Sequence, residues 1–228
     1  MTKPHSALNQ LTPELLLRAY ASGIFPMSEA RGDPNIFWVD PRLRAVLPLD
    51  AFHVSRSLAK TVRKKIFQIS CDTAFADVIN ACAASTQERQ ETWINDEIIN
   101  AYTELHHMGF AHSVECRRDG ALVGGLYGVS IGAAFCGESM FHTAANASKV
   151  ALVHLVARLK LGGYVLLDTQ FVTDHLKQFG IIEIPARKYL TRLDKALEIE
   201  AAFPVEVAPQ EEEKALEDIF SGVLGVRS

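Results

Sequence analysis

The chain has 228 residues and a mass of 25.1 kDa, enough for one large domain or two small ones with a well-buried core. Hydrophobic residues make up 48% and charged residues 22%, which excludes collagen-like, disulfide-scaffold and fully disordered chains. With a net charge of −4 and a pI of about 6.1, the chain lacks the basic excess of a general nucleic-acid binder. Any contact with nucleic acid must therefore come from a local patch.

The first segment, residues 1–10, is polar and has no apolar region behind a basic stretch, so no targeting signal is expected there. A helix is predicted over residues 11–21, because Thr12 can cap it and Pro13 suits its first turn. Residues 23–48 hold four prolines, which exclude a continuous helix or a central strand. The same segment carries large apolar side chains, namely Ile24, Phe25, Phe37 and Trp38. It either wraps over a core or forms one wall of a pocket.

A basic helix is expected over residues 54–66. At helical spacing its cationic side chains fall on one side and its apolar side chains on the other, with no acidic residue between them. The cationic side chains are Arg56, Lys60, Arg63 and Lys64. Such a one-signed face favours an anionic partner, although one-signed faces also arise by chance.

The remainder alternates strands and helices. A hairpin is predicted over residues 112–129, with Asp119-Gly120 in its turn. Asn146 is expected to cap a long helix that runs to Lys160. Further strands are expected over 67–71, 131–141, 164–171 and 181–184, and further helices over 74–84, 96–108, 173–179 and 187–198. This order predicts an α+β sheet domain.

The strand at 164–171 is the clearest candidate for chemistry. Side chains alternate along a strand, so Leu166, Asp168 and Gln170 are expected on one face. A carboxylate and a carboxamide would then lie together near the carboxyl end of the strand, where ligands often bind in open sheets. The alternative is that both side chains cap the next helix or bond to loop backbone.

A second candidate is Glu138, which lies within the apolar block 135–141. If it is buried, its carboxylate needs a partner or a raised pKa; the alternative is an ordinary paired surface glutamate. Ser139 does not sit in a GxSxG elbow, so a hydrolase nucleophile is disfavoured.

Other chemistries lack their motifs. The four cysteines, Cys71, Cys82, Cys116 and Cys136, form no CxxC pair. The histidines at 106, 107 and 112 have the wrong spacing for a metal site, so no metal is expected. The ATP-binding motif GxxxxGK[ST] and the dinucleotide-binding GxGxxG are both absent.

Several short blocks together resemble the leucyl/phenylalanyl-tRNA–protein transferases. In chain order they are GIFP at 23–26, FWVDP at 37–41, TWI at 92–94, GGLYG at 124–128, FCGESMF at 135–141, NASK at 146–149 and DTQ at 168–170. The resemblance covers about residues 11–197. It implies a small N-terminal domain over 1–52, whose proline-rich loop contributes to the pocket. It further implies a GNAT-like acyltransferase domain over 53–199, with a mixed, mainly antiparallel sheet and flanking helices. An acidic tail without a catalytic role follows over 200–228.

The resemblance also assigns roles to individual residues. Asp168 and Gln170 match the catalytic pair of the family, and Glu138 matches a carboxylate close to the reaction centre. Residues matching the substrate pocket are Trp38, Trp93, Tyr102, Leu126, Phe135 and Leu155, with Tyr102 near the terminal adenosine. The basic face at Arg56, Lys60, Arg63 and Lys64 resembles the patch that holds the tRNA acceptor stem. The chain departs from the family pattern at Met27 and Phe37, which bears on side-chain preference, and at His142, Thr143 and Ala145, which bears on acceptor selection.

The implied reaction moves Leu or Phe, and Met less well, from aminoacyl-tRNA to the N-terminal Arg or Lys of a protein, which creates an N-degron. It needs no cofactor. A cytoplasmic monomer without membrane contact is expected. Two alternatives are an N-acyltransferase using acyl-CoA, disfavoured because residues 141–146 contain no phosphate-binding glycine, and a non-catalytic tRNA- or peptide-binding adaptor.

The expected chemistry divides between two side chains. Gln170 accepts an N–H of the attacking amine, and Asp168 orients Gln170 and stabilises the developing ammonium charge. On the sequence alone, Asp168→Asn is therefore predicted to slow transfer while leaving the melting temperature nearly unchanged.

Overall fold

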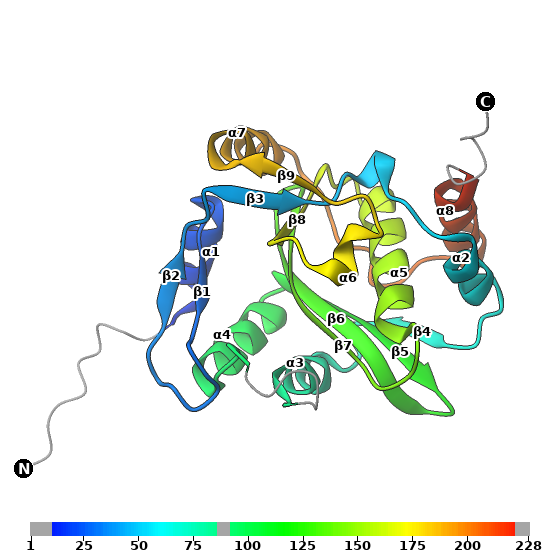
Figure 1. Cartoon of the computed structure of the whole chain (residues 1–228), viewed down its shortest axis with the longest axis horizontal. Coiled ribbons are helices and arrows are strands. Elements are labelled where there is room, and N and C mark those ends of the chain that lie inside the picture. Colours follow the sequence, from blue (N-terminus) through cyan, green and yellow to red (C-terminus); the bar gives the residue numbers. More distant parts are fainter. Residues whose placement is uncertain (1–10, 86–91, 222–228) are drawn as a thin grey trace, which may run out of the picture.

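The computed structural model describes residues 11–85 and 92–221 (Figure 1). The strands are β1 (Phe25–Met27), β2 (Phe37–Val39), β3 (Leu43–Val46), β4 (Gln68–Cys71), β5 (Ala111–Arg118), β6 (Ala121–Ile131), β7 (Ala134–His142), β8 (Leu166–Gln170) and β9 (Ile182–Pro185). The helices are α1 (Pro13–Ala21), the 3₁₀ turn η1 (Leu49–Ala51), α2 (Arg56–Arg63), α3 (Phe75–Ala83), α4 (Asp96–His107), α5 (Ala147–Leu161), α6 (Asp174–Lys177), α7 (Ala186–Leu197) and α8 (Pro209–Ser221). The predicted helices and strands from residue 54 onward are confirmed to within a few residues at each end.

A seven-stranded sheet of order β4-β5-β6-β7-β8-β3-β9 forms the centre of the molecule. All of its neighbouring strands pair antiparallel except β7 and β8, which are parallel and are joined through α5. The predicted α+β class, with a mixed, mainly antiparallel sheet and flanking helices, is thereby confirmed.

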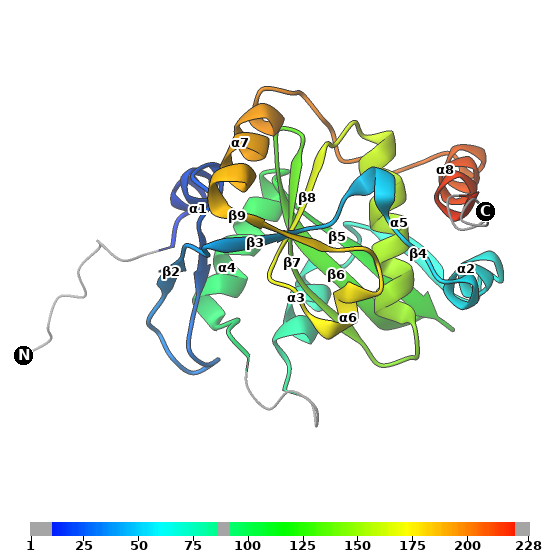
Figure 2. The same cartoon turned by 45° about the horizontal axis from the view of Figure 1, so that its top comes forward.

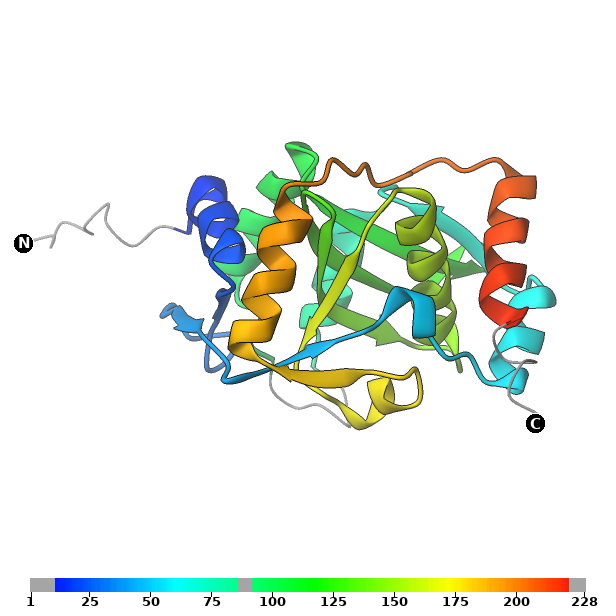
Figure 3. The same cartoon turned by 90° about the horizontal axis from the view of Figure 1, so that it is seen from above.

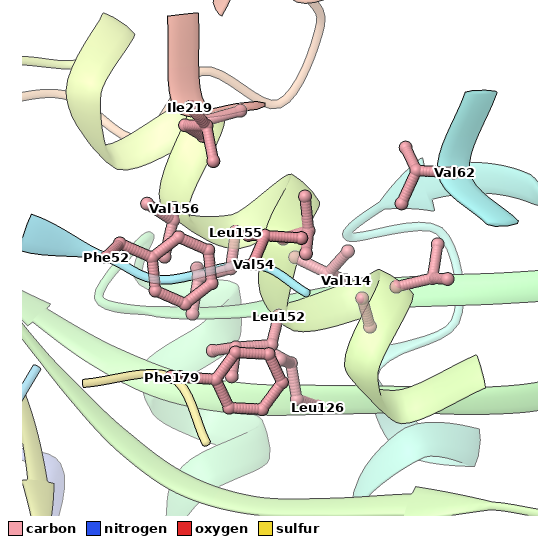
Figure 4. Packing of buried hydrophobic residues seen from close by; sticks show 14 of the residues in the cluster. Phe52, Val54, Val62, Val114, Leu126, Leu152, Leu155, Val156, Phe179 and Ile219 are labelled. Atoms are coloured by element: carbon pink, nitrogen blue, oxygen red, sulfur yellow. The ribbon is translucent and has the colours of Figure 1, made fainter. Parts of the chain in front are cut away.

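Two apolar clusters cover the two faces of this sheet. On one face α5 packs on β5, β6 and β7, and Figure 4 shows Leu152 and Leu155 of α5 in a cluster with Leu126 and Phe179. On the other face lie α3 and α4, together with α1 and α7 (Figure 2). Strand alternation divides β8 between them, since Leu166 joins the second cluster and Leu167 the first.

Helix α5 is buried on almost every side from Ala147 to Leu159, because the sheet covers one side and α2 and α8 pack against it as well. An apolar sequence all round a helix is typical of such a position. Asn146 stands at its N-cap position, but its φ is 69° and its side chain accepts no capping hydrogen bond. The predicted asparagine cap is therefore wrong, because this backbone is left-handed rather than extended as a capping residue requires.

The N-terminal part contains α1 and a separate two-stranded sheet of β1 and β2. Thr12 caps α1 by accepting a hydrogen bond from the Leu15 N–H, as predicted. Residues 43–46, expected to be irregular, instead form β3 between β8 and β9. That expectation was wrong because the prolines at 41 and 48 flank this stretch and leave its own N–H groups free to pair. β3 precedes residue 52 and belongs to the large sheet. The domain boundary expected at residue 52 stays a prediction. Residues 1–10 of the expected N-terminal domain lie outside the described part.

The acidic segment near the C-terminus forms α8, which lies beside α2 at the end of the molecule opposite β1 and β2 (Figure 3). Glu217 pairs with Arg63 of α2 at 2.6 Å, and Glu212 pairs with Arg158 and His154 of α5. Residues 222–228 of the predicted tail lie outside the described residues. No helix within 11–85 and 92–221 has the length and apolar character needed to cross a membrane.

Candidate active site

The site lies where β7 and β8 separate. These two strands pair over Ala134–Leu166, Phe135–Leu167 and Cys136–Asp168, and no further pair follows toward their carboxyl ends. Glu138 is the extra residue of a bulge in β7. Tyr127 of β6 pairs with Ser139 and Gly128 of β6 pairs with Gly137, which leaves Glu138 without a partner in the register. Bulges re-aim a side chain and end regular pairing, and they are common beside active sites.

A pocket of about 430 Å³ opens at this separation. Its floor is apolar and is formed by Leu126, Met140, Leu152, Leu155, Leu167 and Leu176, with Met27, Trp93 and Phe171 among its other apolar lining residues. Its polar lining consists of Glu138, Ser139, His142, Ser148, Thr169, Gln170, Thr173 and His175. An apolar cavity with a few converging polar groups is the usual form of a small-molecule site.

Gln170 presents its amide to this pocket through an unusual backbone turn. Its φ is 63°, and the Phe171 N–H donates to the Thr169 carbonyl across it at 2.6 Å, which is the bonding pattern of a γ-turn. The side-chain Nε2 donates to Glu138 Oε1 at 2.9 Å. Within the described chain no hydrogen bond reaches Gln170 Oε1, so this oxygen is available to accept a proton donor in the pocket.

Glu138 holds the Gln170 amide and is itself held by two phenols. Tyr20 donates to Glu138 Oε1 at 2.7 Å, Tyr102 lies 3.4 Å from Oε2, and the two tyrosine hydroxyls bond to each other. Burial raises the pKa of Glu138 to about 7, although the hydrogen bonds from Tyr20 and Gln170 lower it. Burial also raises the pKa of both phenols well above 10, so they remain donors at neutral pH.

Asp168 is fully buried and its carboxylate is fully engaged. Arg44 donates to both oxygens from Nε at 2.9 and 3.0 Å and to Oδ2 from Nη2 at 2.5 Å. Tyr189 donates to Oδ2 at 2.9 Å, and the backbone N–H of Gln170 donates to Oδ1 at 2.8 Å. Asp168 is absent from the pocket lining. It therefore holds the backbone of Gln170, whereas Glu138 holds the side chain.

Both sequence-derived interpretations of this strand need correction. Asp168 and Gln170 do not point the same way from one regular face, because the positive φ of Gln170 breaks the alternation. Asp168 bonds to loop backbone, as the alternative interpretation expected, because its carboxylate accepts the Gln170 N–H. Gln170 lines the pocket, as the ligand-binding interpretation expected.

Sequence comparisons place the chain in a known family. Residues 46–194 match the sequence model for leucyl/phenylalanyl-tRNA protein transferase, and residues 9–42 match the model for the N-terminal domain of the same proteins. The chain belongs to the leucyl/phenylalanyl-tRNA–protein transferase family. It is therefore an enzyme that transfers an aminoacyl group from tRNA to protein, and neither the adaptor nor the acyl-CoA alternative is retained.

Relatives of this transferase that carry the same name cover nearly its whole length. The protein of Nitrobacter winogradskyi is 60% identical over 87% of this chain and 88% of its own. That of Rhodopseudomonas palustris strain HaA2 is 56% identical over 96% and 99%, and that of Paramagnetospirillum magneticum is 58% identical over 83% and 91%. Among solved structures, L-PGS from Bacillus licheniformis aligns with 12% identity and a TM-score of 0.43 over 90% of this chain and 76% of its own.

The residues assigned to the substrate pocket divide into two groups. Trp93, Leu126 and Leu155 line the pocket. Phe135 and Tyr102 are absent from the lining: Phe135 is buried in the same apolar cluster as Leu126, and the Tyr102 hydroxyl lies 3.4 Å from Glu138 Oε2. Trp38 does not reach the pocket, because its pairing with Pro26 in the β1–β2 sheet places it, 37% exposed, over a smaller hollow beside Leu15. A role for Trp38 in the transferase stays a prediction.

The basic face on α2 is exposed, but one of its members is already paired. Arg63 donates to both carboxylate oxygens of Glu217 at 2.8 and 2.6 Å. Arg56, Lys60 and Lys64 form no ion pair within the described part of the chain. Binding of phosphate by this face stays a prediction, and Arg63 would have to leave Glu217 in order to take part in it.

Sequence reasoning missed Tyr20, Arg44 and Tyr189. Their side chains meet Glu138 or Asp168 only through contacts that span 21 to 124 residues of chain. Arg44 lies in a short strand that the prolines concealed, and the tyrosines occupy the buried faces of α1 and α7. A single buried arginine in an otherwise apolar strand was the available signal, because such a cation requires an acidic partner.

Proposed function

We propose that this transferase moves Leu or Phe, and less efficiently Met, from aminoacyl-tRNA to the N-terminal Arg or Lys of a protein, which marks the product as an N-degron. The observation that supports this is the apolar pocket of about 430 Å³, with the amide of Gln170 and the carboxyl of Glu138 in its lining. Leu and Phe side chains fit such a floor, and a hydrophobic pocket discriminates only weakly against a near isostere such as Met.

The proposed chemistry is aminolysis of an ester that is already activated. The nitrogen of the acceptor bonds to the ester carbonyl carbon, the bond from that carbon to the ribose oxygen breaks, and the proton released by the amine goes to that oxygen, directly or through water. A free α-amino group has a pKa near 7.7–8.0, so a useful fraction is neutral at pH 7. The site therefore mainly has to position its reactants.

Gln170 and Glu138 divide the task in this proposal. Oε1 of Gln170 accepts an N–H of the amine and directs its lone pair at the ester. Glu138 holds Nε2 of the same amide, and its ionised form stabilises positive charge that develops on the nitrogen. Asp168 acts behind Gln170 rather than on the substrate. No step requires a cofactor. We expect a monomer, because one chain carries all of these groups. We also expect the enzyme to act in the cytoplasm.

The function can be tested with an Arg-starting peptide and three donors: phenylalanyl-tRNA, leucyl-tRNA and acetyl-CoA. The expected result is a peptide extended by Phe or Leu at its N-terminus, with no acetylated peptide. Acetylation without aminoacyl transfer would contradict the proposal. A peptide that starts with Ala serves as the acceptor control and is expected to remain unmodified.

The size of the apolar floor should determine which side chain is transferred. Leu155→Phe adds a ring to the floor, so we expect transfer of Phe to fall about 10- to 100-fold relative to transfer of Leu. The matched control is Leu159→Phe, one turn along α5 and buried outside the pocket lining. It overpacks the core to a similar degree and should leave the ratio of Phe to Leu transfer unchanged. An equal change of ratio in both variants would contradict the assignment.

Charge on α2 should control binding of tRNA. We expect the double variant Lys60→Glu with Lys64→Glu to raise the KM for charged tRNA, and to flatten its salt dependence by about one unit of slope per lost phosphate contact. Transfer from a minimal aminoacyl-adenosine, which lacks the acceptor stem, should change little. The measurement is KM for both donors between about 50 and 200 mM salt.

A matched control for that variant exists on α7. Lys188→Glu with Arg192→Glu changes the net charge equally, at the same i, i+4 spacing and at exposed positions. If α2 is the tRNA platform, the α7 variant keeps the salt slope of the unmodified enzyme. Equal effects of the two variants would attribute the change to overall charge and would remove α2 as a specific platform.

A further inference from the structure

The Gln170 amide is presented by a backbone conformation that is unfavourable by itself. A φ of 63° is left-handed, and a residue with a side chain adopts it at a cost of about 1–3 kcal/mol unless its surroundings determine it. Gln170 is also the last residue of β8, and it pairs with Ala45 of β3 across a shift in register. Left alone, this end of the strand would relax toward the extended conformation and turn the amide away from the pocket.

One contact opposes that relaxation directly. Oδ1 of Asp168 accepts the Gln170 N–H at 2.8 Å, which ties the turn to a carboxylate two residues earlier. A carboxylate can do this only if it is itself immobile. Asp168 has no exposed surface, and among the described residues its carboxylate accepts its other hydrogen bonds from Arg44 and Tyr189.

Arg44 is fixed from several directions. Its Nη1 donates to the Gly23 carbonyl at 2.9 Å, and its guanidinium lies between the rings of Phe25 and Tyr189, 4.6 and 4.5 Å from their centroids. Its side chain is 1% exposed. A planar guanidinium that contacts two aromatic rings and donates to both oxygens of one carboxylate has almost no freedom to rotate.

We propose that Arg44 and Tyr189 are positioning residues of the transfer reaction, which fix the Asp168 carboxylate and through it the left-handed turn that presents the Gln170 amide to the pocket. This inference rests on the proposed function, since it takes Gln170 as the group that acts on the amine. Neither side chain lines the pocket. Their loss should therefore lower kcat and leave the KM for aminoacyl-tRNA unchanged.

The first test is Tyr189→Phe, which removes one hydroxyl and keeps the ring that stacks on Arg44. The expected result is a fall in kcat of about tenfold, the scale of one hydrogen bond to a charged group, with an unchanged KM. The matched control is Tyr164→Phe, which removes another buried phenol, bonded to Ser130 at 2.6 Å and outside the pocket lining. It should lower the melting temperature similarly and leave kcat within about twofold. Equal losses of kcat in the two variants would overturn the proposal.

A second variant, Arg44→Lys, keeps the positive charge but loses the guanidinium N–H groups that donate to both oxygens of Asp168. It should lower kcat more than Tyr189→Phe does, again at constant KM, because a point charge cannot hold both carboxylate oxygens. Should this variant fail to fold, Tyr189→Phe carries the test. A folded Arg44→Lys enzyme with unchanged kcat would overturn the proposal.

A double-mutant cycle separates positioning from any other role. If Tyr189 acts through Gln170, then Tyr189→Phe causes no further loss of single-turnover rate in an enzyme that already carries Gln170→Ala. A tenfold loss in that background as well would show that Tyr189 acts by another route and would overturn the inference. Failure of the proposed function looks different, since the unmodified enzyme would then transfer no amino acid from charged tRNA in the first place.

Discussion

Gln170→Ala should lower the single-turnover rate of transfer from phenylalanyl-tRNA to an Arg-starting peptide by about 10²- to 10³-fold, the cost of removing one preorganised polar group at a reacting centre. The variant loses the only amide that couples the pocket to Glu138 in the described structure. The binding of charged tRNA, measured in parallel, should change little, because the apolar floor and α2 are untouched. Alanine also keeps the backbone N–H that Asp168 accepts.

Gln178→Ala is the matched control for this experiment, since it removes an exposed carboxamide from the neighbouring end of α6. It should transfer at the normal rate. A near-normal rate for folded Gln170→Ala would remove Gln170 from the chemistry and leave a structural role at the end of β8. Combining Gln170→Ala with Asp168→Ala should cost much less than the product of the two single losses, because the two residues act as a unit.

Asp168→Asn is a poorer test than the sequence indicates. The structure argues against a nearly unchanged melting temperature, because the carboxylate is buried against Arg44 at 2.5 Å. Breaking such a pair leaves a buried cation uncompensated, which costs about 3–5 kcal/mol. We expect this variant to lose both rate and stability, so its rate alone does not identify a catalytic role.

The second large effect concerns Glu138 and pH. With burial raising its pKa to about 7, kcat at saturating donor and acceptor should rise between about pH 6 and 8 as the carboxyl ionises, because kcat reports groups of the bound complex rather than of the free peptide. Glu138→Gln should remove this rise and lower the plateau about 10²-fold. The exposed Glu183→Gln on β9 is the control and should keep the profile. A rise near pH 7 that persists in Glu138→Gln would assign it to another group.

The same pKa predicts a stability signature of opposite sign. Between the ordinary value of 4.5 and about 7, the folded state binds more protons at Glu138 than the unfolded state does. The stability from this group is therefore fully present below about pH 4.5 and is lost as pH rises through 7. Melting temperatures at pH 5 and 8 should consequently differ less for Glu138→Gln than for the unmodified enzyme. An identical difference in both proteins would mean that Glu138 does not titrate in this range.

The order of elements in the sheet domain could be predicted from local patterns. The Asp119-Gly120 hairpin turn, the strand that carries Asp168 and the long helix up to Lys160 each depend on a few neighbouring residues, and each formed as expected. The prediction failed at β3, where a four-residue strand between prolines becomes stable only by pairing with β8 and β9. The predicted capping role of Asn146 was also wrong, because this residue has a left-handed backbone in the connection from β7 to α5.

By itself the sequence determined the fold class, the family, and the residues Glu138, Asp168 and Gln170 as the ones to examine. Only the tertiary structure decided how they divide the work. A bulge in β7 and a left-handed residue at the end of β8 turn Glu138 and Gln170 toward each other, while Arg44 and Tyr189 take up the carboxylate of Asp168. The tertiary structure likewise placed Trp38 away from the pocket and paired Arg63 with Glu217. Residue spacing reports which face of a helix or strand a side chain occupies. Which groups meet across a hundred residues depends on sheet register and on single backbone angles, which local spacing does not encode.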